Sequence, residues 1–298
     1  SILVNNIIYK IVNYNLIFYV LIVLLGIISS FSLPPYNLFF LNFISLPILF
    51  ILFQTKNKNA FKSFCVGWFF GFGYFFSNIY WINHSLTFDN SYKLLIPISL
   101  FLIPLLLATF YGLATLVLHF FKLKNNFNSI LLFSTIFALT EFLRGITFTG
   151  FPWNLIAYSI SSYTNSLQIL SYIGTYSLNL LCYTIFLTPV IYFMNINFKI
   201  KVYSSLIIII LILSNSYFGS IKKKIFEIKK DIIKINIKII SPKIEIKRYF
   251  ENEDPIIKIN EIIKLSDPKK NSDTLYIFPE GILSGIYFNE LQDFEKIF

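Results

Sequence analysis

Long apolar stretches recur through residues 1–218 and exclude a soluble globular fold for this part of the chain. A membrane-spanning helix needs about 20 mostly apolar residues. Only Asp89 and Glu141 are acidic in this part, and 13% of the whole chain is charged, against about 25% in a typical soluble domain. We therefore expect a polytopic α-helical membrane domain over residues 1–219. The sequence predicts seven spans, at residues 15–33, 36–53, 62–86, 94–121, 129–146, 166–194 and 202–219.

Lysines mark alternate connections between these spans, which predicts the orientation of the chain. The lysine-bearing segments contain Lys10, then Lys56, Lys58 and Lys62, then Lys122 and Lys124, then Lys199 and Lys201. Basic residues favour the cytoplasmic side, so we expect a cytoplasmic N-terminus and, after seven crossings, an external segment at residues 220–298. Residues 222–224 are all lysine and oppose this count. We expect them to begin the soluble segment, because larger soluble segments translocate largely regardless of charge.

Residues 220–298 contain the pattern of a strand, a helix and a second strand. Isoleucines alternate with polar residues over 233–240, which predicts a strand whose polar face is exposed. Apolar residues recur at helical spacing over 251–265, and 275–278 reads as a short buried strand. The order predicts a βαβ unit with a right-handed crossover. Glu280 follows the second strand, where α/β proteins place their chemistry, although a single glutamate there is more often an ordinary surface residue.

Two stretches of the membrane part contain polar residues or breaks that a simple span would lack. Glu141 and Arg144 are three residues apart, so they share a helix face and can pair. They form either a structural ion pair at the membrane edge or the lining of a cavity. Residues 148–154, which include Gly150 and Pro152, break the helix and keep an aromatic character, as expected at an interface or beside a cavity. Gly67 and Gly71 share another helix face, which favours close helix packing.

Thiol, metal and nucleotide chemistry receive little support from the sequence. Cys65 and Cys182 fall inside predicted spans, where a cysteine is usually inert. We see no metal-ligand spacing and no Gly-rich nucleotide motif, so we expect neither a metal nor a cofactor. The basic excess lies in loops that flank the spans, so we expect no nucleic-acid partner.

Taken together, these features resemble the apolipoprotein N-acyltransferase family, bacterial inner-membrane enzymes with a nitrilase-like domain. The similarity covers nearly the whole chain. Its motifs are Glu141-x-x-Arg144-Gly145 with Phe148-Thr149-Gly150-Phe151-Pro152-Trp153, then Phe31-Ser32-Leu33-Pro34-Pro35, a Gly/aromatic third span ending at Trp81, Ser241-Pro242-Lys243 in place of the usual Gln-Pro-Asn, and Phe278-Pro279-Glu280 in place of the usual Trp-Pro-Glu.

The resemblance implies an activity, partners and site residues. Residues 220–298 would begin a periplasmic nitrilase-like αββα domain. The family uses a Glu-Lys-Cys triad to move an acyl chain from a phospholipid, through a thioester, to the α-amine of a lipoprotein's diacylglyceryl cysteine. Glu280 matches the general base, which removes the thiol proton. We expect Phe151, Trp153, Glu141 and Arg144 on the substrate side of the membrane domain.

The sequence departs from the family after Glu280. We find no lysine or cysteine that matches the remaining triad members, and Lys296 is the only later lysine. We therefore expect a fragment, or the product of a truncated gene, that is inactive by itself. Two alternatives stay open at this point, namely a membrane-tethered carbon–nitrogen hydrolase and a non-catalytic remnant. A transporter is disfavoured because we see no pair of related halves.

Overall fold

The computed structural model describes residues 15–56, 59–87, 90–124, 126–148, 150–228, 235–241, 255–269, 273–280 and 282. Lys10, Lys58, Asp89, Thr149, residues 233–234, residues 242–254 and Lys296, which the sequence analysis mentions, lie outside the described residues. The chain divides into two compact units, 1–228 and 229–298. Each unit is described by itself.

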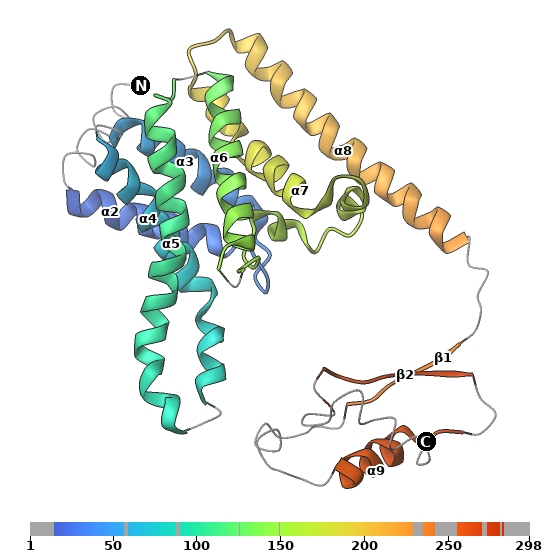
Figure 1. The fold of residues 1–298 in the computed structure, drawn as a ribbon. Helices are drawn as coiled ribbons and strands as arrows, with labels where there is room; N and C mark the ends of the chain where they lie inside the picture. Colours follow the sequence, from blue (N-terminus) through green and yellow to red (C-terminus); the bar gives the residue numbers. More distant parts are fainter. Residues whose placement is uncertain are drawn as a thin grey trace. The chain divides into compact units, whose positions relative to one another are not determined.

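Unit 1 is helical, and each of the seven predicted spans overlaps one long helix (Figure 1). Its long helices are α2 (Asn15–Ser30), α3 (Asn42–Lys56), α4 (Ala60–Asn78), α5 (Ile96–Phe120), α6 (Phe127–Ile146), α7 (Leu170–Phe186) and α8 (Phe198–Ile228). Short 3-10 helices join or extend them, namely η1 (Phe39–Leu41), η2 (Tyr80–Thr87), η3 (Asn90–Leu95), η4 (Ile156–Ile160), η5 (Ser166–Ile169) and η6 (Thr188–Phe193).

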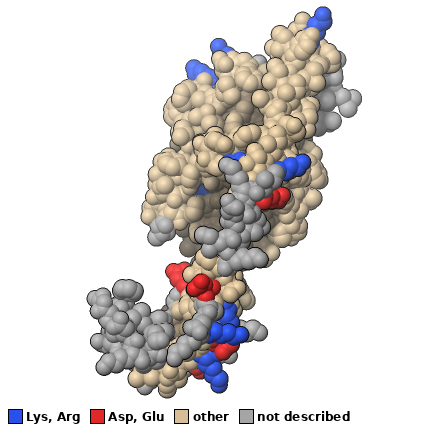
Figure 2. Space-filling model, turned by 90° about the vertical axis from the view of Figure 1, so that its right-hand side faces the viewer, with Lys and Arg blue, Asp and Glu red and all other residues tan. Residues whose placement is uncertain are grey.

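Four segments of the described chain are long and apolar enough to cross a membrane, which makes this a multi-pass membrane protein. They are Asn90–Phe120, Phe127–Ile146, Ser166–Phe193 and Phe198–Glu227, while the apolar helices Asn15–Ser30 and Phe39–Thr55 are shorter. Most of the surface in the space-filling view of Figure 2 is neither acidic nor basic, as expected for a surface in contact with lipid. Because four segments of the described chain meet the length and composition needed for a span, the seven crossings remain a prediction.

Three predicted spans have the wrong limits. The second begins at Asn42, after a turn and η1, instead of residue 36. The third ends as an α-helix at Asn78, whose side chain is engaged outside its helix, and continues only as η2. The helix of the last span extends to Ile228, so residues 222–224 belong to α8, and the point at which the soluble segment begins stays a prediction. Hydropathy locates apolar runs, whereas these limits depend on polar contacts and on helical structure that outlasts the apolar run.

Glycines let α4 approach two neighbouring helices at backbone contact distance. A Cβ atom on Gly67 would lie 2.1 Å from the carbonyl oxygen of Tyr111 in α5. A Cβ atom on Gly73 would lie 2.1 Å from the carbonyl oxygen of Val23 in α2. These distances are far below van der Waals contact, so the packing role predicted for the glycines of this helix is confirmed at Gly67.

Two of the predicted lysine-bearing connections, the one between α3 and α4 and the one between α5 and α6, lie at the same end of unit 1. The Gln54 side chain of α3 donates a 3.2 Å hydrogen bond to the carbonyl oxygen of Lys124, just before α6. Ser63 Oγ in α4 lies 3.2 Å from His119 Nδ1 in α5. The connection between α6 and α7 instead contacts the last residue of α4 and the C-terminal half of α8. The pairing of helix ends thus agrees with the lysine alternation, and the side that faces the cytoplasm stays a prediction.

Unit 2 contains the predicted strand, helix and strand, in the form β1 (Asn236–Ile239), α9 (Pro255–Ser266) and β2 (Thr274–Ile277). The strands are parallel, with Asn236 opposite Thr274 and Ile239 opposite Ile277. Asp267 takes a left-handed backbone conformation with φ 44° and Pro268 follows, which ends the helix as predicted. The nitrilase-like αββα architecture remains a prediction, because the described residues form only this two-stranded sheet.

The predicted burial of both strands is wrong. The face of β1 that α9 covers carries Ile240, 6% exposed, and Lys238, whose ammonium group donates a 2.6 Å hydrogen bond to the carbonyl oxygen of Ser266. The other face is apolar and open, with Ile235, Ile237, Ile239, Leu275 and Ile277 all 44–74% exposed. Alternation in sequence shows that two faces differ, but the position of α9 decides which one is covered. The long aliphatic stem of Lys238 lets its ammonium group reach the Ser266 carbonyl oxygen at the end of α9, although the residue lies on the covered face.

Candidate functional site

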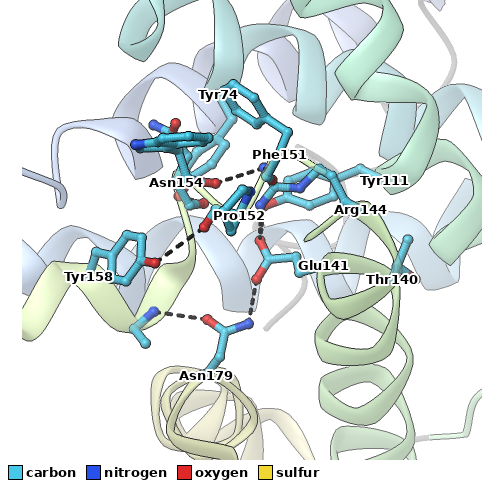
Figure 3. Close-up of polar contacts among 12 residues, drawn as sticks. Tyr74, Tyr111, Thr140, Glu141, Arg144, Phe151, Pro152, Asn154, Tyr158 and Asn179 are labelled. Carbon is cyan, nitrogen blue, oxygen red and sulfur yellow. Dashed lines mark hydrogen bonds and ion pairs between the residues drawn. The ribbon is translucent and has the colours of Figure 1, made fainter. Parts of the chain in front are cut away.

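The loop after α6 is held in place by hydrogen bonds from side chains to its backbone carbonyl groups, as Figure 3 shows. Four consecutive carbonyl oxygens accept hydrogen bonds from side chains. Arg144 donates to those of Phe151 and Trp153, at 3.1 and 2.7 Å. Tyr158 donates to that of Pro152 at 3.2 Å, and Tyr74 donates to that of Asn154 at 3.0 Å. We call residues 151–154 the clamped loop. Irregular backbone next to a membrane is stable only where its polar groups are satisfied by protein or water.

Arg144 is the main donor to the clamped loop. The residue is 1% exposed, so its two hydrogen bonds to the loop form in a water-poor interior where they are strong. The centre of its guanidinium group lies 5.0 Å from the centroid of the Phe75 ring and 5.8 Å from that of Phe151. These cation–π contacts fix the plane of the guanidinium group and hence the direction of its donors.

Glu141 neutralises Arg144 and connects it to α5 and α7. The predicted pairing is confirmed, since Glu141 Oε1 lies 3.8 Å from Arg144 Nη2. The carboxylate also accepts hydrogen bonds from Tyr111, from Tyr183 at 3.1 Å and from Asn179. Both charged residues are almost fully buried, so the pair lies inside the helix bundle instead of on its surface. The hydrogen bonds to the carboxylate and those from Arg144 Nη1 offset part of the desolvation cost of the pair, while Arg144 Nε and Nη2 have no hydrogen-bond partner among the described residues.

Polar side chains from other helices complete the support. Asn179 accepts a 2.9 Å hydrogen bond from the backbone N–H of Ala157, which ties the chain just after the clamped loop to α7. The Asn154 side chain donates to Asn78 at the end of α4, and Asn78 donates to the carbonyl oxygen of Ser30 in α2. The clamped loop is therefore bound directly to α4 and α6, and indirectly to α2 through Asn78 and to α7 through Ala157. Partial burial raises the pKa of the Tyr158 phenol, so Tyr158 stays a donor to Pro152 at neutral pH.

The backbone of this region bends through left-handed conformations, which confirms the predicted helix break. Phe148, Gly150 and Asn154 have φ values of 56°, 74° and 59°. The bend directs aromatic side chains outward, because Phe148 is 97% exposed and Trp153 is 52% exposed. Phe151 is partly buried, and its ring lies 5.3 Å from that of Trp153, centroid to centroid. The outer surface of the loop is therefore aromatic, while its carbonyl groups point into the protein.

The structure brings together four of the five predicted site residues, Glu141, Arg144, Phe151 and Trp153. Figure 3 labels the first three of them. Sequence reasoning missed Tyr74 and Asn179, which support them. Both are polar residues within apolar helices, and polar groups at such positions need partners. This rule could have identified Asn179, but no sequence spacing relates it to Glu141.

Glu280, the fifth predicted residue, belongs to unit 2. It lies three residues after the end of β2, as predicted, and its side chain is exposed. The partial desolvation expected for a general base is therefore not found in this structure. Cys65 and Cys182 lie in α4 and α7, inside predicted spans as expected. Within the described ranges, no three His, Cys, Asp or Glu side chains are grouped closely enough to hold a metal ion.

Comparison with known proteins identifies the helical part. Residues 25–188 match the family model of the apolipoprotein N-acyltransferase N-terminal domain, a range that includes Glu141, Arg144 and the clamped loop. A protein named apolipoprotein N-acyltransferase from Brucella melitensis biotype 1 is 32% identical over 173 residues, 55% of this chain and 32% of the relative. One of the same name from Rhizobium etli is 30% identical over 176 residues, 56% of this chain and 33% of the relative. The aligned part of the chain thus spans about a third of the length of these curated relatives.

Proposed function

This chain belongs to the apolipoprotein N-acyltransferase family, and on that basis we propose that it contributes to N-acylation of bacterial lipoproteins. The acyl donor is a membrane phospholipid, and the acceptor is the N-terminal diacylglyceryl cysteine of an apolipoprotein. The protein lies in the bacterial inner membrane with unit 2 on the periplasmic side. The support for this proposal is the family match over residues 25–188, which encloses the clamped loop and the buried groups that hold it.

The proposed reaction has two acyl-transfer steps, and Glu280 acts in both as the general base. It takes the proton of a cysteine thiol, whose sulfur attacks the ester carbonyl of the phospholipid. The ester C–O bond breaks, and the lysophospholipid leaves with that proton. The α-amine of the diacylglyceryl cysteine then attacks the thioester, the C–S bond breaks, and Glu280 passes the amine proton to the leaving thiolate. A lysine stabilises the oxyanion in each step.

The thiol and the lysine of this mechanism have no match among the 298 residues, so the reaction is proposed for the full-length family protein. Cys65 and Cys182 lie in helices of the membrane unit. Apolar surroundings also disfavour a thiolate. Glu280 lies instead at the end of β2.

Within the membrane unit, we assign the clamped loop to the acyl chains of the substrates. Phe151 and Trp153 present an aromatic surface that suits lipid chains at the membrane interface. Glu141 and Arg144 are too deeply buried to touch a chain in this structure. They belong to the substrate site because they fix the backbone from which Phe151 and Trp153 project.

A labelled-lipid experiment tests the proposal. A chimera would join this chain to the remaining sequence of the Brucella melitensis relative, and would be incubated in membranes with acyl-labelled phospholipid. After a denaturing wash, we expect label on the protein that hydroxylamine releases, as a thioester requires. Glu280→Gln should abolish this label while leaving the amount of folded protein unchanged.

Two further results decide between functions. Adding a diacylglyceryl peptide should move the label to the peptide as an amide. If label is instead released as free fatty acid at the same rate with and without peptide, the protein is a hydrolase. The 298-residue chain alone should retain no releasable label. Label on it that disappears with Cys65→Ser or Cys182→Ser would show that the thiol is misplaced in this proposal.

A further inference from the structure

The C-terminal part of α8 carries a basic cluster that the proposed function does not use. We propose that Lys222 and Lys223, together with Thr164 and Ser171, form a binding surface for the phosphate group of an anionic membrane phospholipid. All four residues belong to unit 1, and the proposal does not depend on the acyl-transfer reaction. It also accounts for a cluster of lysines that opposes the predicted topology.

Both lysines point at the connection that leads into α7. Lys222 Nζ lies 2.5 Å from Ser171 Oγ and 3.5 Å from the carbonyl oxygen of Gln168, and 4.5 Å from the centroid of the Tyr172 ring. Lys223 Nζ lies 3.2 Å from Thr164 Oγ1. Two ammonium groups and two hydroxyl groups therefore gather between α8 and the segment 164–172. Ser171 Oγ donates its own proton to the carbonyl oxygen of Gln168 at 2.9 Å, so the two ammonium groups are the main donors offered to the oxygen acceptors of a phosphate.

The charge of this cluster is not neutralised by the groups it contacts. The acceptors of Lys222 and Lys223 are hydroxyl and carbonyl oxygens, which are neutral. The sequence from Gly145 to Ile228 contains one acidic residue, Glu227, against the three consecutive lysines. Glu227 is exposed, one turn beyond Lys223. The cluster therefore keeps a net positive charge, which attracts anions.

The position of the lysines along α8 places them at the level of lipid headgroups. Residues Leu206–Leu213 are apolar, and most of their side chains are exposed, so they fit the middle of the bilayer. Lys222 follows the centre of this run by about twelve residues, which is ~18 Å along a helix. Half of the hydrocarbon core of a bilayer is ~15 Å thick. The ammonium groups therefore lie just outside the hydrocarbon, where phospholipid phosphates are found.

The other end of α8 supplies a matched control. Lys199 and Lys201 are two lysines at the start of the same helix, and Lys201 Nζ donates a 2.9 Å hydrogen bond to the carbonyl oxygen of Tyr192. The double variants K222Q/K223Q and K199Q/K201Q each remove two charges. If the lysines only anchor the helix at the membrane surface, the two double variants should weaken lipid binding equally. A built phosphate site depends on Lys222 and Lys223 alone.

The test is a titration of the detergent-solubilised 298-residue chain with phosphatidylglycerol, read by native mass spectrometry. K222Q/K223Q should weaken retention of the lipid by about fivefold for each lysine removed. K199Q/K201Q should change it clearly less, because these two lysines lie at the other end of α8. K222R/K223R should keep binding, because the charge remains. Diacylglycerol, which lacks the phosphate, should bind equally to all variants.

Several outcomes would overturn the assignment. Equal losses in the two neutral variants would show general membrane electrostatics, and no loss in either would show that the lysines only dock α8. Tight binding of soluble glycerol phosphate, competing fully with the lipid, would identify a free phosphate compound as the ligand. If K222Q/K223Q does not fold, the single variant K223Q removes one contact, to Thr164, and should still weaken phosphatidylglycerol retention.

Discussion

Arg144 in α6 donates a 2.7 Å hydrogen bond from Nη1 to the carbonyl oxygen of Trp153, nine residues further along the chain. The same nitrogen serves the carbonyl oxygen of Phe151 at 3.1 Å. The end of a membrane helix and the loop that follows it are thus joined by one buried cation. Because Glu141 holds the other side of that cation, the direction of the Trp153 backbone depends on a charge pair inside the bundle.

Replacing Arg144 should destabilise the helical unit. Arg144→Met removes both donors to the clamped loop and leaves Glu141 buried without its counter-charge, which costs about 3–5 kcal/mol in comparable buried pairs. The measurement is thermal unfolding of the detergent-solubilised chain. The double variant Arg144→Met with Glu141→Gln should recover part of this loss, because no unpaired charge remains. Equal unfolding temperatures for wild type and Arg144→Met would contradict the clamp.

Trp153 and Phe148 form a matched pair for testing the aromatic surface. Both are exposed aromatic residues of the same connection, but Phe148 is 97% exposed and Trp153 packs against Phe151. In the full-length chimera, Trp153→Ala should slow acyl transfer by about tenfold or more, as loss of apolar contact to a substrate does. Phe148→Ala should have a much smaller effect. If activity and protein abundance fall in parallel for Trp153→Ala, the residue is structural.

Close helix contact predicts different outcomes for two glycine substitutions. A Cβ atom at Gly67 would meet a backbone carbonyl oxygen at 2.1 Å, whereas at Gly112 it would first meet the ring of Phe64, at 2.6 Å. A ring can rotate away, but a backbone atom moves only if α4 and α5 separate. Gly67→Ala should therefore cost about 1–3 kcal/mol or more, and Gly112→Ala clearly less. Thermal unfolding in detergent measures both, and the reverse order would contradict this packing.

The contacts between helix ends predict the sidedness of fusions. The clamped loop touches the end of α4, and the neighbouring segment 164–172 touches the C-terminal half of α8, so these parts share one side. The Lys124 region lies at the opposite end, near Gln54. A reporter active only outside the cytoplasm should work after Phe298 and within 161–163, and should be inactive after Lys124. The reverse pattern would contradict the proposed periplasmic position of unit 2.

The sequence alone predicted the helical membrane part, the pairing of Glu141 with Arg144, the break after α6 and the order strand, helix, strand. Each of these depends on residues close together in the chain, on apolar run length or on spacing along one helix. It did not predict the role of Tyr74 or Asn179. These residues reach the clamped loop and Glu141 from α4 and α7, and sequence spacing carries no information on such distant contacts.

Tertiary structure decided which surfaces of these elements are used. The isoleucine face of β1 is open and the Lys238 face is covered, because α9 packs on that side and the carbonyl oxygen of its last residue, Ser266, accepts a hydrogen bond from the lysine. Likewise, α8 runs past its apolar segment to Ile228, so Lys222 and Lys223 meet segment 164–172. The sequence determined which segments are apolar enough to be removed from water, and the local spacing of apolar residues determined which segments form helices and strands. Packing between distant elements determined which polar groups face one another, because burying a polar group costs free energy unless it is hydrogen-bonded.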